Sequence, residues 1–332
     1  MLITTTSKEY SMPHTRTVGT DGYMYNENTH WGQLPAGWSL EEVAGVAVDS
    51  ENRLYVFSRS AHPITVFDRE GTFIESWGEG VFQRPHALYM ATDDTLFCTD
   101  DIAHTIYRFT LDGQELMSIK TPPADTGYDG ADMYSVARSG PPFNTPTAVT
   151  QAPDGTLFVS DGYGNARVHH FTEEGKLLNS WGEPGSESGQ FVTPHDAYVD
   201  AEGRVYISDR QNCRIQIFTA DGTLDNIWDD THWPCDMCRG PDGNLYVAEV
   251  GGVFMGDPDT SRPAARITVR DQDGHILCEW SDQDPMDSGQ YFSPHAIAVD
   301  SRGDIYVGEV KKSYPGGRAP AGASVLRKYV RK

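Results

Sequence analysis

Three Pro-His pairs begin three strand-like runs, and all three occupy the same position of an internal repeat. The pairs are Pro85-His86, Pro194-His195 and Pro294-His295. The repeat has six copies, and in the other three the position of the histidine is held by Ala44, Thr147 and Cys235. The histidines therefore fall on the second, fourth and sixth copies. If six such units close into a ring, the three imidazoles lie about 120° apart around its axis.

Three histidines gathered on one axis predict a metal site with His86, His195 and His295 as the ligands. Neutral imidazoles suit Zn²⁺, and three protein ligands leave a fourth position open, as in catalytic zinc sites. Imidazole also binds other divalent transition metals, so the ligand set favours Zn without selecting it. The alternative is purely structural: a Pro-His pair that only caps each strand.

Each copy of the repeat has an apolar strand, a turn, and a second apolar strand that in most copies ends in an acid, followed by two further strands. Four short strands per unit with Asp-Gly turns predict an all-β, six-bladed β-propeller in a single domain. We expect the blades at about residues 43–78, 85–120, 146–182, 194–228, 234–281 and 294–330.

Two segments fall outside these blades. The sixth unit lacks a fourth strand, and we expect residues 22–31 to supply it, because Trp31-Gly32 matches the Trp-Gly that follows other fourth strands. This N-terminal strand would close the ring and remove its open edges. The insertion at 121–145 is long enough to form a lid over the site, since long loops in compact folds are often functional.

The charge of the chain limits its partners. Its 332 residues carry a formal net charge of −22, which argues against nucleic acid and anionic membranes, because both need a basic surface. No apolar run is long enough to span a bilayer, and the first ten residues lack a signal-peptide core. The five cysteines are scattered and are expected to be reduced thiols. We therefore expect a cytoplasmic protein that acts on a small molecule.

Cations and a phenol accompany the histidines on the expected active face. Arg59 is interpreted as replacing the acid that ends the second strand in the other copies, which have Asp100, Asp161, Asp209, Glu249 and Glu309. Arg210 follows one of these acids directly, and Tyr163 follows another after a glycine. Two arginines near a metal can bind a substrate carboxylate. Further residues expected to line the substrate site are His62, Tyr128, Tyr134 and Arg138.

These residues resemble those of a known family. Over about residues 31–332 the chain is similar to the NHL-repeat six-bladed propellers and, among them, to the catalytic core of the peptidyl-α-hydroxyglycine α-amidating lyases. The resemblance rests on the Pro-His pairs and on the motifs 57–62, 160–167 and 209–216. It implies zinc on His86, His195 and His295, Tyr163 as the catalytic base, and Arg59 and Arg210 at the substrate.

The chain also departs from this family. The resemblance implies a structural calcium with an aspartate ligand directly after the third histidine, but Ala296 stands there, which argues against Ca. Gly164 stands where secreted members have a cysteine. We expect no monooxygenase domain before the propeller, and therefore expect the chemistry on a carbinolamide smaller than a peptidyl-α-hydroxyglycine.

Three hypotheses follow for the function. The first is a metal-dependent lyase that cleaves the C–N bond of an α-hydroxyglycine-like carbinolamide to an amide and glyoxylate or a related aldehyde. The second is a metal-dependent hydrolase of the lactonase or esterase type, in which the same three histidines activate water. The third is a non-catalytic NHL interaction scaffold, because a fold alone does not determine function.

Overall fold

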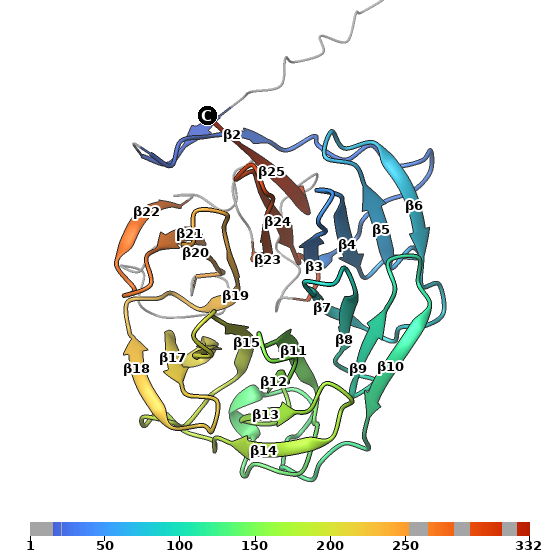
Figure 1. Cartoon of the computed structure of the whole chain (residues 1–332). Coiled ribbons are helices and arrows are strands. Elements are labelled where there is room, and N and C mark those ends of the chain that lie inside the picture. Colours follow the sequence, from blue (N-terminus) through green and yellow to red (C-terminus); the bar gives the residue numbers. More distant parts are fainter. Residues whose placement is uncertain (1–15, 21, 252–264, 282–292, 314–323) are drawn as a thin grey trace, which may run out of the picture.

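The computed structural model describes residues 16–20, 22–251, 265–281, 293–313 and 324–332. Six antiparallel sheets are arranged in a ring around a central axis, as Figure 1 shows. This arrangement confirms the predicted all-β, six-bladed propeller. No helix in these ranges is long and apolar enough to cross a bilayer.

Five blades have four strands each, and consecutive strands pair in sequence order. Blade 1 contains β3 (Val43–Val48), β4 (Leu54–Ser58), β5 (Ile64–Phe67) and β6 (Phe73–Trp77). Blade 2 contains β7 (Pro85–Met90), β8 (Leu96–Asp100), β9 (Thr105–Phe109) and β10 (Glu115–Lys120). Blade 3 contains β11 (Pro146–Gln151), β12 (Leu157–Asp161), β13 (Arg167–Phe171) and β14 (Leu177–Trp181).

The second half of the ring repeats this plan. Blade 4 contains β15 (Pro194–Val199), β16 (Val205–Asp209), β17 (Arg214–Phe218) and β18 (Leu224–Trp228). Blade 5 contains β19 (Pro234–Arg239), β20 (Leu245–Glu249), β21 (Arg266–Arg270) and β22 (Ile276–Ser281). Blade 6 contains β23 (Pro294–Val299), β24 (Ile305–Glu309) and β25 (Leu326–Arg331), together with the N-terminal strands β1 (Thr17–Val18) and β2 (Tyr25–Asn28).

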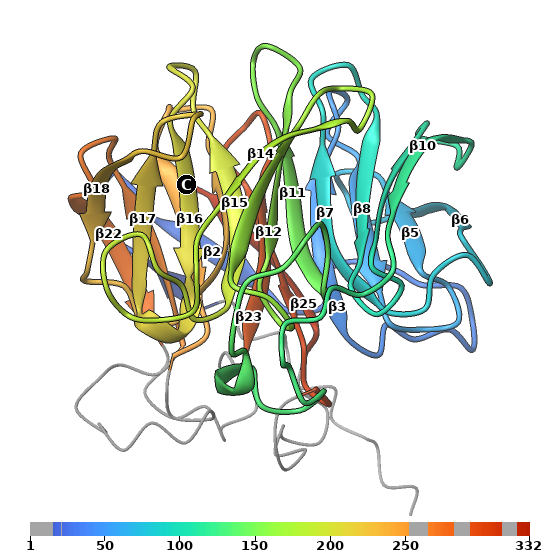
Figure 2. The same ribbon diagram turned by 90° about the horizontal axis from the view of Figure 1, so that it is seen from below.

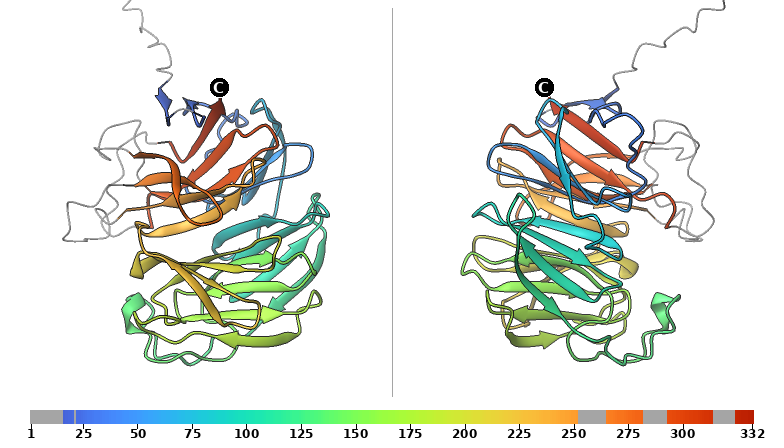
Figure 3. Two further views of the ribbon diagram at one scale, coloured as in Figure 1. Left: turned by 60° about the vertical axis from the view of Figure 1, so that its left-hand side comes forward. Right: turned by 90° about the vertical axis from the view of Figure 1, so that its right-hand side faces the viewer.

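The N-terminal strand β2 closes the ring by pairing antiparallel with β25, as Figure 3 shows near the C-terminus. The closure is held by a buried charge network. The Arg327 guanidinium lies 2.7 Å from a Glu27 carboxylate oxygen and 2.5 Å from a Glu309 carboxylate oxygen. The Tyr329 hydroxyl donates to Glu27 at 3.0 Å. Strand β2 is therefore tied to both β25 and β24.

The tryptophans at the ends of fourth strands pack against the turn glycines of neighbouring blades. A Cβ added at Gly113 or Gly222 would lie 2.9 or 2.8 Å from a ring atom of Trp77 or Trp181. Both glycines have a positive φ, which a side chain rarely adopts. Trp31 contacts Gly71 in the same way, so its likeness to the other tryptophans reflects a shared packing position.

The acid at the end of each second strand has a structural role. In blades 2 to 6 its carboxylate accepts hydrogen bonds from backbone N–H groups directly before or at the start of the first strand. The ladder of blade 1 pairs Val43 with Ser58, whereas other blades pair the equivalent proline with the acid. Ser58 therefore holds the acid position, and the interpretation that Arg59 replaces an acid is wrong by one residue.

The insertion between blades 2 and 3 includes a single 3-10 turn, η1 (Met133–Ser135), and projects from one face of the disc in Figure 2. First strands begin and second strands end at this same face. The Met133 sulfur lies 3.2 Å from the Arg210 guanidinium, so the insertion reaches the ring of second-strand ends.

Candidate functional site

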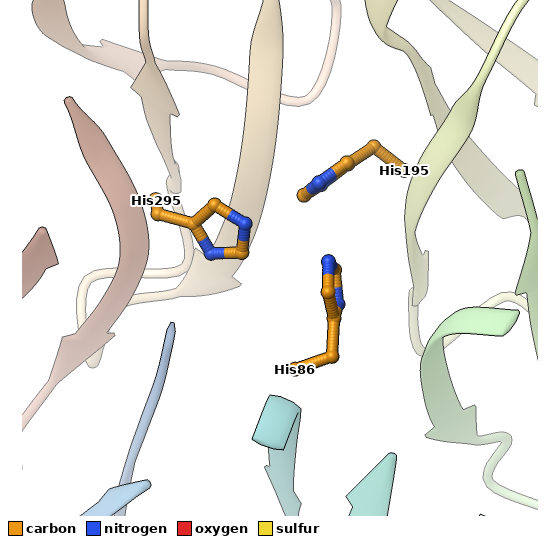
Figure 4. Close-up of side chains that lie close together, drawn as sticks. All are labelled: His86, His195 and His295. Atoms are coloured by element: carbon orange, nitrogen blue, oxygen red, sulfur yellow. The ribbon is translucent and has the colours of Figure 1, made fainter. Parts of the chain in front are cut away.

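Three imidazoles meet on the propeller axis. His86, His195 and His295 are the second residues of β7, β15 and β23, on alternate blades. Their ring centroids lie 4.8 to 4.9 Å apart, and one nitrogen from each lies within 4.8 Å of the others. Figure 4 shows the three rings converging from separate strands. All three side chains are buried, and together they could hold a metal ion.

Each of these histidines is oriented by a backbone carbonyl of the next blade. The Nδ1 atoms of His86, His195 and His295 lie 2.5, 2.8 and 2.9 Å from the carbonyl oxygens of Thr147, Cys235 and Ala44. A carbonyl oxygen only accepts, so each Nδ1 carries the proton and each Nε2 keeps its lone pair. This arrangement is typical of metal-binding histidines, whose other ring nitrogen is fixed by a hydrogen bond.

The surroundings keep the three imidazoles neutral. Burial lowers the pKa of His86 and His195 well below the usual range, and lowers the pKa of His295 to about 3. Positive charge on Arg59 and Arg210 contributes to the low pKa of His295. Neutral imidazole is the form that binds metals. The donor set, the tautomers and the charge state therefore all suit a transition metal.

The Tyr163 hydroxyl lies over this tripod. Its oxygen is 3.0 Å from Nε2 of His86 and 3.0 Å from Nε2 of His195. Gly162 permits this position, because a Cβ there would lie 2.1 Å from the Pro194 carbonyl oxygen. A side chain at Gly164 would lie 2.5 Å from Asn144 Oδ1, so a larger residue there requires Asn144 to move.

The two predicted arginines occupy equivalent positions on opposite blades. The Arg59 N–H donates to Glu42 at 2.9 Å, and the Arg210 N–H donates to Thr193 at 3.1 Å, which is the same bond in blades 1 and 4. The Arg59 guanidinium donates to the Pro85 carbonyl and pairs with Glu42. Arg210 is buried and its guanidinium lies 5.3 Å from the centre of the Tyr163 ring. The pair therefore stands on two sides of the axis.

Arg84 was not predicted as a site residue. Its guanidinium lies 5.8 Å from the centre of the Tyr163 ring and is held by Asp101 at 2.6 to 2.9 Å. Asp101 occupies on blade 2 the position that Arg59 and Arg210 occupy on theirs. Because Arg84 directly precedes Pro85, its place in the repeat was the signal that could have identified it.

The remaining predicted substrate residues are placed differently. The ring of His62 stacks on Trp38, with centroids 3.3 Å apart, and its Nδ1 lies 3.1 Å from Glu79, so these outer contacts engage it away from the tripod. Tyr128 is half-buried and packs against the apolar core of blades 3 and 4; burial raises its pKa and the positive charge of nearby Arg84 opposes this rise, so Tyr128 lies beside Arg84. Tyr134 is 63% exposed, and Arg138 forms an exposed ion pair with Asp125.

Two carboxyl groups lie on first strands, one residue after the position that the histidines hold on their blades. Asp196 accepts from the Met237 N–H at 2.9 Å, and Asp236 accepts from the Ile297 N–H at 2.8 Å. Burial raises the pKa of both, and the charge of Asp236 raises that of Asp196 further. Ala296 holds the equivalent position on blade 6, so the acids at this level come from blades 4 and 5.

The cysteines form no disulfide, and all five are free. Cys235 and Cys238 lie on opposite faces of β19, as expected for residues i and i+3 of a strand.

Comparison with known proteins supports the resemblance. The NHL repeat model matches residues 191–218, which cover β15 to β17. Peptidyl-glycine alpha-amidating monooxygenase from Mus musculus is 28% identical over 307 residues, covering 81% of this chain and 29% of that protein. Peptidyl-alpha-hydroxyglycine alpha-amidating lyase 1 from Drosophila melanogaster is 26% identical over 256 residues, covering 70% and 44%. The chain is a six-bladed propeller that contains an NHL-repeat match in blade 4 and resembles the amidating lyases.

Other relatives bear on how far this resemblance extends. NHL repeat-containing protein 3 from Homo sapiens is 26% identical over 325 residues, covering 94% of this chain and 85% of that protein. Among solved structures, virginiamycin B lyase from Staphylococcus aureus has a TM-score of 0.59 at 16% identity, covering 93% of this chain and all of that one, which shows the fold alone. The chain spans about three tenths of the length of the mouse monooxygenase it matches.

Proposed function

We propose that this protein is a metal-dependent lyase that cleaves the C–N bond of an N-acyl-α-hydroxyglycine-like carbinolamide. The products are a primary amide and glyoxylate. The observation that carries the proposal is the position of the Tyr163 hydroxyl, 3.0 Å from two of the three imidazoles and bracketed by the Arg84 and Arg210 guanidiniums. A phenol in this place can reach any hydroxyl group that binds over the tripod.

His86, His195 and His295 would hold the metal through their Nε2 atoms. A bound Zn²⁺, or another divalent transition metal, supplies Lewis-acid polarisation of the substrate hydroxyl. Tyr163, as its phenolate, takes the hydroxyl proton as general base, within the reach that proton transfer needs. The C–O bond gains double-bond character while the C–N bond breaks, and the leaving amide nitrogen takes up a proton. One O–H and one C–N bond are exchanged for one C=O and one N–H bond.

The arginines fit an anionic substrate. Arg59 and Arg210 place positive charge on two sides of the tripod in a protein whose net charge is −22. Because they stand on opposite blades, we propose that one holds the substrate carboxylate and the other stabilises the oxyanion that develops. A small carboxylate-bearing carbinolamide satisfies both.

The test is product analysis with metal-loaded protein and N-benzoyl-α-hydroxyglycine. The lyase predicts benzamide and glyoxylate in equal amounts, and removal of the metal by a chelator should stop the reaction. A hydroxy acid from a lactone, or an acid plus an alcohol from an ester, with no glyoxylate from the carbinolamide, would instead indicate the hydrolase. A protein that binds no metal would favour the interaction scaffold.

A further inference from the structure

The propeller face at which the second strands end forms the mouth of the tripod. Among the described residues, this mouth has two chemically different halves. One residue in each blade directly follows the acid position at this face, and the six residues there are Arg59, Asp101, Gly162, Arg210, Val250 and Val310. The backbone shows that these positions are equivalent. The Val250 and Val310 N–H groups donate to Trp233 and Ser293, just as those of Arg59 and Arg210 donate to Glu42 and Thr193. Blades 1 to 4 therefore present charges and a phenol, and blades 5 and 6 present valines.

The two valines belong to an apolar cluster that reaches the level of the histidines. Val250 and Val310 pack with Ala44, Cys235 and Trp233, and all five are buried. The carbonyls of Cys235 and Ala44 are the groups that orient His195 and His295. The cluster thus lies directly beside two of the three histidines. We call these five residues the apolar wall.

Trp233 carries an unused hydrogen-bond donor in this wall. It is 7% exposed, and its indole N–H has no acceptor within the part of the chain that the structure describes. The indoles of Trp31 and Trp77, by contrast, donate to carbonyl oxygens. Trp181 and Trp228 also lack an acceptor, but they lie on the outer strands β14 and β18. A buried donor without a partner beside a reaction centre indicates a place for a ligand acceptor.

We infer that the apolar wall binds the acyl group of the substrate and that Trp233 determines specificity for it. This inference rests on the proposed lyase function. A carbinolamide has a carboxylate at one end and an acyl group at the other. If the carboxylate lies on the cationic half, the acyl group lies against the apolar half. The acyl carbonyl oxygen then accepts from the indole N–H. The substrate class is an N-acyl-α-hydroxyglycine with a bulky apolar acyl group.

The test compares three substrates that differ only in the acyl group: N-acetyl-, N-benzoyl- and N-succinyl-α-hydroxyglycine. Glyoxylate release gives kcat/KM for each. The benzoyl compound should exceed the acetyl compound by about tenfold or more, in the range that apolar pockets achieve. The succinyl compound, which carries a charge into the wall, should be the poorest of the three.

Variants then assign the preference to the wall. Trp233→Ala should reduce the benzoyl-to-acetyl ratio to about threefold or less. Trp233→Phe keeps the apolar surface but lacks the N–H, so it should lower kcat/KM for all three substrates by a similar factor. Val250→Thr is close in shape and should also reduce the ratio, which covers a Trp233→Ala protein that fails to fold. Trp228→Phe is the matched control and should leave all values unchanged.

The outcomes separate this inference from the function it rests on. Glyoxylate from all three substrates at rates within threefold of each other would overturn the acyl site and leave the lyase standing. A benzoyl preference that survives in both Trp233→Ala and Val250→Thr would place the acyl group elsewhere. No glyoxylate from any of them, with metal bound, would overturn the lyase and this inference together.

Discussion

The Tyr163 hydroxyl oxygen lies 3.0 Å from Nε2 of His195, although the two residues belong to different blades. The Nδ1–H of His195 donates to the Cys235 carbonyl, so the Nε2 that faces the phenol is unprotonated. The phenol therefore donates to an imidazole, and at the same time occupies the open side of the tripod. A ligand that approaches the three imidazoles from this side must therefore contact the Tyr163 oxygen or displace it.

Replacing Tyr163 by phenylalanine separates catalysis from metal binding. If the phenol is the base, Tyr163→Phe should lower kcat by on the order of 10²–10⁴ while the metal content stays unchanged. Both are measured on the same preparation, by glyoxylate release and by elemental analysis. Turnover close to that of the wild type on a confirmed substrate would rule out the base role.

Single replacements of the three histidines test the metal site. His86→Ala, His195→Ala and His295→Ala should each reduce the metal bound per chain, because two imidazoles hold a divalent metal much less tightly than three. His30→Ala, at an exposed position, is the control and should keep full occupancy. If all three variants retain the wild-type metal content, the ion is bound elsewhere.

The arginines should not tolerate lysine. Arg59 and Arg210 offer a planar fork that matches a carboxylate, and lysine offers only a point charge. Arg59→Lys or Arg210→Lys should raise KM or lower kcat by about tenfold or more, since a charged hydrogen bond is worth roughly 1.5–3 kcal/mol. Steady-state kinetics on both variants distinguish the arginine that binds the carboxylate from the one that acts on the oxyanion. Full rescue by lysine at both positions would contradict the proposed contacts.

Removing the N-terminal strand should open the ring. A variant that lacks residues 1–32 loses β2 and leaves Arg327 without Glu27, its partner at 2.7 Å. We expect aggregation, because β25 becomes an open sheet edge. The milder Glu27→Ala should cost on the order of 3 kcal/mol, as expected when one partner of a buried ion pair is removed. Size-exclusion chromatography and thermal unfolding measure both effects. A soluble deletion variant with an unchanged melting temperature would show that the ring closes otherwise.

The Asp196–Asp236 pair predicts a pH dependence of stability. Burial raises the pKa of Asp236 in the folded state above the value near 3.9 that an unfolded chain has. The folded state therefore keeps a proton that the unfolded state releases, and this contribution to stability is lost as the pH rises from about 4 through about 7. Asp236→Asn mimics the protonated acid. Its gain in unfolding free energy over the wild type should grow between pH 4 and 8, to about 1–3 kcal/mol.

Urea denaturation of both proteins without added metal, at several pH values, measures this difference. The sign is the informative part of the result. A loss of stability in Asp236→Asn at pH 8 would mean that the two carboxyls are ionised together and share a cation rather than a proton.

The fold and the tripod were predictable from the sequence because both depend on position within a repeat. Strand periodicity fixes which residue of each unit faces the axis, so equal positions predict equal placement for His86, His195 and His295. The N-terminal closing strand followed from a missing strand in the sixth unit. None of these inferences needed the details of packing.

Features that depend on local register were not predictable in the same way. Arg59 was misaligned because blade 1 has Ser58 in place of the acid, and only the strand ladder shows the correct pairing. His62 is near Arg59 in sequence, but the turn after β4 carries it to Trp38. Asp101 forms an ion pair with Arg84, and Arg84 in turn lies beside Tyr163 of the next blade. No repeat pattern predicts such a contact between three different positions.

The closure of blade 6 couples the geometry of the site to a pairing between distant parts of the chain. Strand β2 precedes the first strands of all six blades in the chain, whereas its partner β25 follows the other strands of the ring. Until these strands pair, the ring is open between blades 1 and 6, which are the blades that carry Ala44 and His295. Because the Ala44 carbonyl orients His295, we expect the three imidazoles to reach their final geometry only when β2 has paired with β25. We therefore expect the tripod to bind a metal only after the ring has closed.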